Sequence, residues 1–422
     1  MRKIAVTAAA AAVLTAGLQV PAWAAAPAAP TDVTVGWSSG KIQLTWKDAG
    51  EANNVYVEYP GTSVVTLLAS VPSTDANDVV LATTLGNTDR ARLVVKSVTG
   101  SELSEGAATP EFDTQVPGQP VLQDASLATN LTTQLKWSQP AVVDPNPGDP
   151  LDLPATGETL KAFVDLPGAA TNSYDLDKSA TSATIPAQAR PASIQLLASN
   201  EWGTTRATKS VRLGTLGAGI TVPSKALYSD RLGIKSTIDL FTSEGREERA
   251  SGIPVELQAR AKTTDAWKTY GRYAGNTTAV FDTGIASLGN RQYRLWVPAR
   301  KVVSTNVIAL TPATSTSAKS STTLVKFVSG GFSPSVVRVG GRSTFSVKIA
   351  PAVTVKAHLQ AWTGSSWVPV VDVPLTKGSY VERGDIETDR YTLRVRIVVP
   401  TIGVNGLTVN ANTSPAYNLT VK

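Results

Sequence analysis

Residue types that commonly do chemistry are scarce in this chain. Of its 422 residues one is a histidine, His358, and none is a cysteine. Metal sites built on imidazole or thiolate need several such ligands, so zinc and similar centres are excluded. His358 stands beside Leu359 in a strand-like pattern, which favours an ordinary place on a sheet surface over a catalytic role. We therefore expect no catalytic residue and no cofactor, and predict that the protein is not an enzyme.

Carboxylates are the remaining candidates for acid–base chemistry. The chain has 33 Asp and Glu residues, and any set of that size contains many pairs. Glycoside hydrolases place two carboxylates on either side of a substrate cleft. The short modules described below leave no evident room for a long cleft. A glycoside hydrolase or other hydrolase is thus the last of the alternatives that we keep open.

Oxygen ligands for a metal gather in one loop. It contains Asp144, Asn146, Asp149 and Asp152. Carboxylate and amide oxygens from a loop are typical calcium ligands. The same stretch contains three prolines, which favour a stiff, solvated turn instead. These four residues are our candidate metal ligands, with the turn as the alternative.

Tryptophan is the other residue type that points to binding. Four tryptophans recur at matching places, and we expect them in the core: Trp46, Trp137, Trp267 and Trp367. Four others do not repeat, and they are our candidate ligand-binding residues: Trp37, Trp202, Trp296 and Trp362. A flat exposed indole can stack on a sugar ring, which suits polysaccharide binding. An indole that covers the end of a β-sandwich is the alternative for each of them.

The segments that must position these residues repeat a strand-forming pattern. The matching stretches are Ile42–Trp46 with Thr133–Trp137, and Val255–Gln258 before Trp267 with His358–Gln360 before Trp367. Apolar and polar residues alternate from Thr31 onward in short runs separated by Gly, Pro, Asn and Asp. This alternation predicts β-strands and almost no helix. The fold class that we expect is all-β, a tandem array of about four β-sandwiches.

Joints between the modules are predicted at proline-rich or small polar stretches. They divide the chain into a leader, 1–24, and four modules, 25–115, 116–213, 214–312 and 313–422. Each module has the size of a single sandwich, which can fold on its own core without disulfides. The stretch Thr311–Thr323 is rich in Ser and Thr, so we expect it to be the longest and most flexible joint.

The first two modules share a series of strand features. In the first, Pro30–Val35 leads to a strand that ends at Trp46, then to Val55–Tyr59 and Ala91–Val98. The second module has the matching features Pro120, Trp137, Leu160–Val164 and Ile194–Gly203. With these features the two modules resemble fibronectin type III domains of secreted bacterial proteins. The resemblance implies β-sandwiches of a kind that often accompanies polysaccharide-degrading domains.

The last two modules share a different pattern. In both, a Leu-Gln strand precedes a tryptophan and a later strand that contains Arg and Tyr. The matching features are Trp267 with Arg291–Leu295, and Trp367 with Arg390–Val395. By this pattern the two modules resemble bacterial immunoglobulin-like repeats of secreted actinobacterial proteins. The spacing from tryptophan to tyrosine is 26 residues in one and 24 in the other, so we interpret the two modules as copies of one design.

The N-terminal residues have the features of a secretory signal. Arg2 and Lys3 precede an apolar stretch, Ile4–Val20, and a small-residue cleavage site follows at Ala22–Ala24. We expect the mature protein to be secreted, extracellular or loosely associated with the cell wall, and to have no membrane span after cleavage. Without Arg2 and Lys3 there are 37 basic and 33 acidic residues, a net charge of +4. The basic residues are scattered, which argues against a nucleic-acid partner.

These features together predict a secreted, non-enzymatic multi-module protein that serves binding, adhesion or spacing at the cell surface. Its partner would be an extracellular protein or polysaccharide. A carbohydrate-binding accessory protein for extracellular polysaccharide is the first alternative, and the hydrolase is the second.

Overall fold

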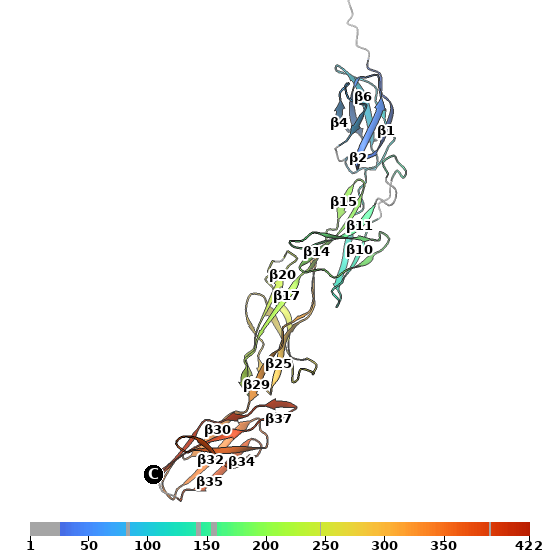
Figure 1. Ribbon diagram of the computed structural model, residues 1–422. Helices are drawn as coiled ribbons and strands as arrows, with labels where there is room; N and C mark the ends of the chain where they lie inside the picture. Colours follow the sequence, from blue (N-terminus) through green and yellow to red (C-terminus); the bar gives the residue numbers. More distant parts are fainter. Residues whose placement is uncertain (1–25, 82–84, 141–144, 153–157, 245, 388–389) are drawn as a thin grey trace, which may run out of the picture. The chain divides into compact units, whose positions relative to one another are not determined.

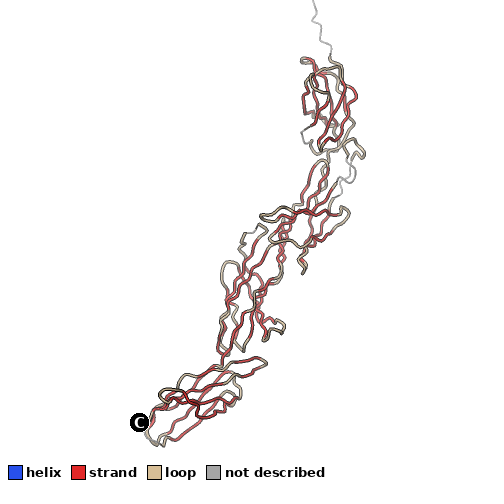
Figure 2. The backbone as a smooth tube through the Cα atoms, in the orientation of Figure 1, coloured by secondary structure: helices blue, strands red, loops and turns tan. Residues whose placement is uncertain are grey.

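The computed structural model describes residues 26–81, 85–140, 145–152, 158–244, 246–387 and 390–422. Throughout these ranges the regular secondary structure consists of strands (Figure 2). The strands form sheets of two to seven members, which confirms the predicted all-β class and the tandem array of sandwiches. The predicted signal, residues 1–24, lies outside the described ranges. No helix that could span a membrane occurs in the part of the chain that is described.

The chain forms two compact units. The first lies within Met1–Gln119, Gln139–Leu160 and Ala198–Thr205, and the second within Pro120–Ser138, Lys161–Leu197 and Arg206–Lys422.

The first sandwich belongs to the first unit (Figure 1). One sheet has the order β1 (Thr31–Ser38), β2 (Lys41–Lys47), β5 (Asp78–Val80). The other has the order β4 (Val65–Val71), β3 (Ala52–Glu58), β6 (Arg92–Thr99), β7 (Glu102–Leu103), with β8 (Ala107–Ala108) also on β6. Alternation along β2 buries Ile42, Leu44 and Trp46 between the sheets, because every second side chain of a strand faces the core.

The second sandwich repeats this arrangement. Its smaller sheet has the order β13 (Ser182–Ile185), β10 (Thr133–Ser138), β9 (Val121–Leu127). Its larger sheet has the order β12 (Asn172–Leu176), β11 (Thr159–Asp165), β14 (Ala192–Asn200), β16 (Ser210–Leu213), with β15 (Gly203–Arg206) on β14. Trp137 on β10 is 1% exposed and Trp46 is 4% exposed, so the prediction that they lie in the core is confirmed.

The larger sheet of the second sandwich continues into the third. β16 pairs in parallel with β27 (Val307–Thr311), which in turn pairs with β26 (Arg300–Val303). The register joins Val211 to Ile308 and Leu213 to Leu310. A hairpin from far along the chain therefore completes this seven-stranded sheet.

The third sandwich has a three-stranded sheet, a six-stranded sheet and a short two-stranded one. Their orders are β17 (Thr215–Thr221), β20 (Lys235–Phe241), β23 (Phe281–Asp282); then β18 (Lys225–Leu227), β29 (Lys319–Leu324), β25 (Arg291–Val297), β21 (Ser251–Arg260), β22 (Lys268–Asn276), with β28 (Thr314–Ser315) on β25; and β19 (Arg231–Leu232), β24 (Ile285–Ala286). β28 and β29 lie in the stretch Thr311–Thr323, so the predicted flexible joint is wrong. Its Ser and Thr side chains belong to strands that pair with β25.

The fourth sandwich has the same plan. Its sheets have the orders β30 (Lys326–Ser333), β32 (Arg342–Ala350), β35 (Ser379–Asp385); then β31 (Val336–Val337), β40 (Tyr417–Val421), β36 (Thr392–Val399), β33 (Val355–Trp362), β34 (Trp367–Leu375), with β39 (Asn412–Thr413) on β36; and β37 (Ile402–Val404), β38 (Leu407–Val409). In both the third and the fourth sandwich a short strand pairs in parallel with the last long strand, β18 with β29 and β31 with β40. The shared topology supports the interpretation that they are copies of one design.

Candidate binding surfaces

Trp37 and Trp202 form an aromatic cluster in the first unit. The Trp37 indole Nε1 donates a hydrogen bond to the Leu151 carbonyl at 2.7 Å, and its ring centroid lies 5.4 Å from that of Trp202. Trp202 in turn stacks on Phe112, with the ring centroids 6.0 Å apart and the planes 8° from parallel. Leu151 and Phe112 are fully buried, and both indoles are half-buried against the same core. Their surroundings match the alternative that we kept open, an indole that covers the end of a sandwich.

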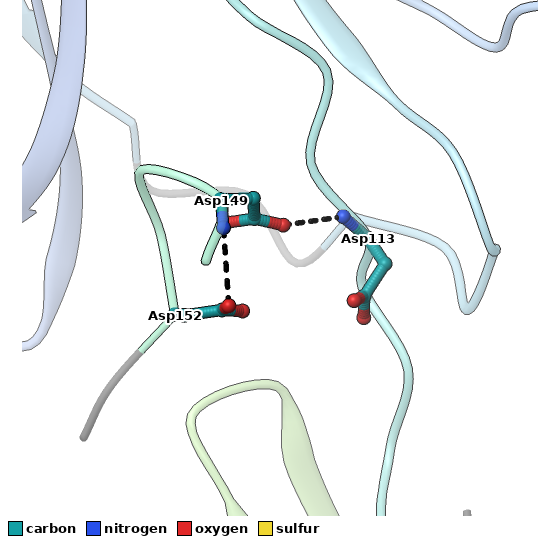
Figure 3. Close-up of side chains that lie close together, drawn as sticks. All are labelled: Asp113, Asp149 and Asp152. Carbon is teal, nitrogen blue, oxygen red and sulfur yellow. Dashed lines mark hydrogen bonds between the residues drawn. The ribbon is translucent and has the colours of Figure 1, made fainter. Parts of the chain in front are cut away.

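Two of the four candidate metal ligands, Asp149 and Asp152, lie together with Asp113 (Figure 3). One carboxylate oxygen from each of these three residues lies within 4.8 Å of the other two. Asp113 could not be found from the loop sequence because it precedes the second module and is brought in by folding. Asn146 lies nearby and donates its amide hydrogen to the Glu111 carbonyl at 2.7 Å. Asp144 is outside the described residues.

These carboxylates accept hydrogen bonds from the backbone of the turn. Asp149 accepts from the N–H groups of Leu151 at 2.7 Å and Asp113 at 2.8 Å, and Asp152 accepts from Asp149 at 3.1 Å. Burial raises the pKa of Asp149, the two backbone hydrogen bonds oppose that shift, and the neighbouring charge of Asp152 adds to it. Three carboxylates this close can supply oxygen ligands to calcium. The hydrogen bonds from backbone N–H groups to Asp149 and Asp152 are equally those of a turn that its own side chains stabilise.

A serine flanked by glycines was overlooked in the sequence. Gly36-Trp37-Ser38-Ser39-Gly40 has the Gly-x-Ser-x-Gly spacing of a nucleophile elbow. That motif needs a strand followed by a helix, whereas here it connects the antiparallel strands β1 and β2 through a turn with φ values of 51° at Ser39 and 74° at Gly40. The local backbone is that of a β-hairpin, so the motif does not have its catalytic setting.

His358 lies on the exposed outer face of the fourth sandwich. Its Nδ1 is 2.7 Å from an oxygen of Asp372, and Lys356 contacts the other oxygen of that carboxylate at 3.2 Å. Hydrogen bonds from Lys356 and His358 lower the pKa of Asp372. This exposed charge cluster agrees with the predicted place on a sheet surface.

Pockets lined by described residues occur in the second unit, and two of them are large enough to compare with a substrate cleft. One, of about 300 Å³, is lined by the charged residues Arg212, Glu248 and Arg300 and by the apolar residues Leu240 and Leu310. The other, of about 440 Å³, has Asp265 as the only carboxylate in its wall. A hydrolytic cleft needs two facing carboxylates, and each of these pockets is lined by one.

The third sandwich has a stack of cations and an indole on its outer sheet face. Leu257 and Ala259 of β21 face the core, so the alternate residues Gln258 and Arg260 face outward. The guanidinium carbon of Arg260 lies 4.4 Å from the centroid of the Trp267 ring, and that of Arg294 lies 4.5 Å from it. Such contacts are the cation–π geometry that indoles favour.

Neighbouring glutamines hold these two guanidinium groups in place. Arg294 donates its Nε–H to Gln258 at 2.9 Å, and Arg260 donates its Nε–H to Gln292 at 2.9 Å. Both hydrogen-bonded pairs connect β21 with β25, which are antiparallel neighbours in the same sheet. Burial and the nearby charge of Arg260 lower the pKa of Arg294.

The fourth sandwich has an equivalent stack with a second indole. Arg396 lies 4.4 Å from the Trp367 ring centroid and donates its Nε–H to Gln360 at 2.7 Å. Arg394 lies 5.6 Å from Trp367 and 5.8 Å from Trp362, and the two indole centroids are 5.4 Å apart. Trp362 and Trp367 also face each other across β33 and β34.

The strand register makes the Gln–Arg–Trp part of the two stacks equivalent, whereas the second arginine differs, because Arg260 corresponds to Trp362 and Arg394 corresponds to Gln292. Gln258 faces Arg294 in the third sandwich as Gln360 faces Arg396 in the fourth. By the same register Tyr293, which is buried opposite Ala259, corresponds to Val395 and not to Tyr391 as the sequence match implied. Trp267 and Trp367 are half-buried on the outer faces, so the prediction that they are core residues is wrong.

Of the other candidate ligand-binding residues, Trp362 is part of the stack just described. Trp296 is half-buried on the outer face of the third sandwich and faces Glu256 across the sheet. Glu256 accepts hydrogen bonds from Thr269 at 2.6 Å and Arg272 at 3.1 Å. The structure therefore places Trp296 and Trp362 on outer sheet faces, and Trp37 and Trp202 against a core.

Comparison with known proteins gives likenesses of fold alone. No family model matches the sequence, and no curated protein matches it. Among solved structures, the chain is similar to a two-domain fibronectin type III segment of chicken tenascin, with 12% identity over 43% of this chain and 96% of that one and a TM-score of 0.21.

It is also similar to the FN1–FN3 domains of chicken CNTN1, with 10% identity over 69% of this chain and 97% of that one and a TM-score of 0.23. A third similar structure is the chicken interferon gamma receptor alpha chain, with 12% identity over 43% and 95% and a TM-score of 0.20. The resemblance of the last two sandwiches to bacterial immunoglobulin-like repeats stays a prediction.

Proposed function

We infer that this protein is a secreted, non-enzymatic binding and spacing protein that acts at or beyond the cell surface. One observation carries the inference: the third and fourth sandwiches each have, on an outer sheet face, an arginine that is hydrogen-bonded to a glutamine and stacked on a tryptophan. Side chains that fill a core are explained by stability. Half-buried indoles and arginines outside the core are typical of contact surfaces.

A spacing role is supported by the way the second unit is joined. The shared sheet of β16, β27 and β26 connects the second sandwich to the third. At the next junction Asn290 donates to Asn410 at 2.7 Å, and the Asn290 amide N–H donates to the Thr408 carbonyl at 2.8 Å. Backbone pairing and side-chain bonds of this kind restrict the motion of neighbouring sandwiches.

A carbohydrate-binding accessory protein is the second candidate. The observation that favours it is the pair of indoles Trp362 and Trp367, half-buried on the face of a sheet. Such a pair offers an amphipathic platform to a sugar ring.

A binding experiment with the mature chain, residues 25–422, tests the proposal. The labelled protein is incubated with cells of the producing organism and with insoluble cellulose, chitin, starch and peptidoglycan. We expect saturable retention on the cell surface without release of soluble fragments from any polymer. Steady release of oligosaccharides would overturn the non-enzymatic assignment, and the absence of saturable retention on any of these materials would overturn the binding role.

A further inference from the structure

The four arginines of the two stacks contact indoles and not carboxylates. Some other arginines of these sandwiches form ion pairs, for example Arg272 with Glu256 and Arg342 with Asp385. Among the described residues none of Arg260, Arg294, Arg394 and Arg396 forms an ion pair. Each is held instead by an indole, and three of them also by a glutamine carbonyl.

This arrangement orients the guanidinium groups without neutralising them. Arginine has five N–H donors in a planar fork, and in three of these residues Nε–H is the donor that the glutamine engages. The remaining donors match the geometry of a carboxylate or sulfate, and stacking limits the entropy lost when they bind one. Two guanidinium groups against one Trp267 ring also repel each other, and a bound anion would relieve that repulsion.

Indoles beside the arginines narrow the chemistry of the anion. In the fourth sandwich Trp362 is half-buried, and Arg394, 5.8 Å from its ring centroid, is exposed. An indole edge or face suits a sugar ring, while the adjacent guanidinium suits an acidic substituent on that ring. A polyphosphate or an acidic peptide would contact the cations alone, whereas an acidic polysaccharide would also place a sugar ring against Trp362.

We propose that the outer faces of the third and fourth sandwiches bind an acidic polysaccharide, with Arg294 and Arg396 contacting its carboxylate or sulfate groups and Trp362 contacting a sugar ring. The inference rests on the proposed binding function and names its ligand class. Because the Gln–Arg–Trp arrangement occurs twice, a polymer with repeated acidic groups can engage both copies. Removing the arginine of one copy then weakens binding, and removing the arginines of both copies weakens it further.

The test measures binding of the full mature chain to soluble polymers by isothermal titration calorimetry at low salt. The probes are polygalacturonate for carboxylate, dextran sulfate for sulfate, neutral dextran, and polyglutamate as an acidic polymer without sugar rings. The main variant is Arg294→Gln with Arg396→Gln. Its matched control is Arg338→Gln with Arg383→Gln, which removes the same charge from exposed positions outside the two stacks.

We expect binding to polygalacturonate or dextran sulfate, with the preferred polymer identifying the acidic group. The Arg294 and Arg396 double variant should bind about a hundredfold more weakly, on the order of tenfold for each charge-assisted hydrogen-bonding group that is removed. The control should change affinity by less than about threefold, in keeping with the small worth of an exposed charge. Trp362→Ala should weaken binding to the acidic polysaccharide, and calorimetric unfolding of every variant verifies that it is folded.

Three results would overturn the inference. Equal affinity for polyglutamate would show a general polyanion surface with no sugar specificity. An equal loss of affinity in the control and the main variant would show that only net charge matters. Binding to none of the acidic polysaccharides, with retention on cells intact, would remove this ligand class and leave the proposed function standing, whereas loss of cell retention as well would remove both.

Discussion

Arg294 and Gln258 face each other across β25 and β21, and the arginine donates its Nε–H to the glutamine carbonyl at 2.9 Å. The same relationship joins Arg396 to Gln360 at 2.7 Å in the fourth sandwich. In each sandwich the glutamine is on the face away from the core, and an indole lies over the arginine. The pair therefore holds a cation in a fixed place on an outer sheet face.

Replacing Gln258 with Ala should destabilise the third sandwich. The change leaves Arg294 Nε without its acceptor in a site where Gln258 is only 9% exposed, and the expected loss is about 1–3 kcal/mol. Differential scanning calorimetry measures it as a lowered transition. Gln134→Ala, at an exposed place on β10, is the control and should shift stability by less than about 0.5 kcal/mol. Equal effects of the two changes would contradict the structural role of the glutamine.

Trp202→Ala should loosen the first unit. The indole stacks on Phe112 and contacts Trp37, so truncation opens a cavity beside a buried ring and costs about 2–4 kcal/mol. Trp37→Phe keeps most of the packing and removes the hydrogen bond to Leu151, for a smaller loss of about 1 kcal/mol. Limited proteolysis and tryptophan fluorescence report both. Unchanged stability combined with an absence of ligand binding would instead make Trp202 a contact residue.

Asp282 should titrate well below an ordinary aspartate. The backbone N–H of Gly284 and the guanidinium of Arg231 lower its pKa from 3.8 to about 2. Since the folded pKa is depressed, the stabilising contribution is present above pH 3.8 and is lost as the pH falls from 3.8 toward 2. Carboxyl NMR titration measures the value, and Asp282→Asn should flatten the stability profile in that window. A midpoint near 4 would contradict the geometry.

Asp149 should show the opposite behaviour. Burial raises its pKa above 3.8, so its favourable contribution to folding is present below pH 3.8 and is lost as the pH rises through the raised value. The same NMR titration tests this, with Asp282 as the internal comparison. Calcium bound at Asp113, Asp149 and Asp152 would favour the charged form and move the Asp149 midpoint downward. A midpoint that calcium does not move would assign the cluster to the turn alone.

Gly378→Ala should be far more damaging than Gly40→Ala. Both glycines have positive φ, 76° and 74°, so each alanine carries a backbone cost of about 1–2 kcal/mol. At Gly378 the new Cβ would also lie 2.9 Å from the backbone of Ile349 and Ala352, whereas Gly40 faces open space. Thermal unfolding compares them. Similar losses at the two positions would show that the backbone around Gly378 yields easily.

The sequence pattern was sufficient to predict the fold class and the buried tryptophans of the first two sandwiches. Alternation along Ile42–Trp46 and Thr133–Trp137 is a local property of a strand, and it identified Trp46 and Trp137 as buried. Trp267 directly precedes β22 and Trp367 begins β34, so no alternating run leads up to either residue and shows which face it occupies. Their partial burial comes from arginines of other strands, which strand pairing brings to them.

Other features could not be read from the sequence for the same reason. Asp113 joins Asp149 only because the chain folds back on itself, and nothing in the loop sequence marks it. The stretch Thr311–Thr323 has the Ser- and Thr-rich composition of a linker, yet its strand β29 pairs with β25 and buries Ser321 and Thr323. Amino-acid composition alone does not show whether the backbone of such a segment pairs with another strand.

The parallel pairing of β16 with β27 has a mechanical consequence. In a parallel pair, the N-terminus of one strand and the C-terminus of the other lie at opposite ends of the paired region. Tension applied there pulls the strands past each other, so the hydrogen bonds from Ser210 to Leu213 are loaded together and not one after another. A chain stretched between a cell and an anchored polymer would resist force at this seam, which would keep the second and third sandwiches together under load.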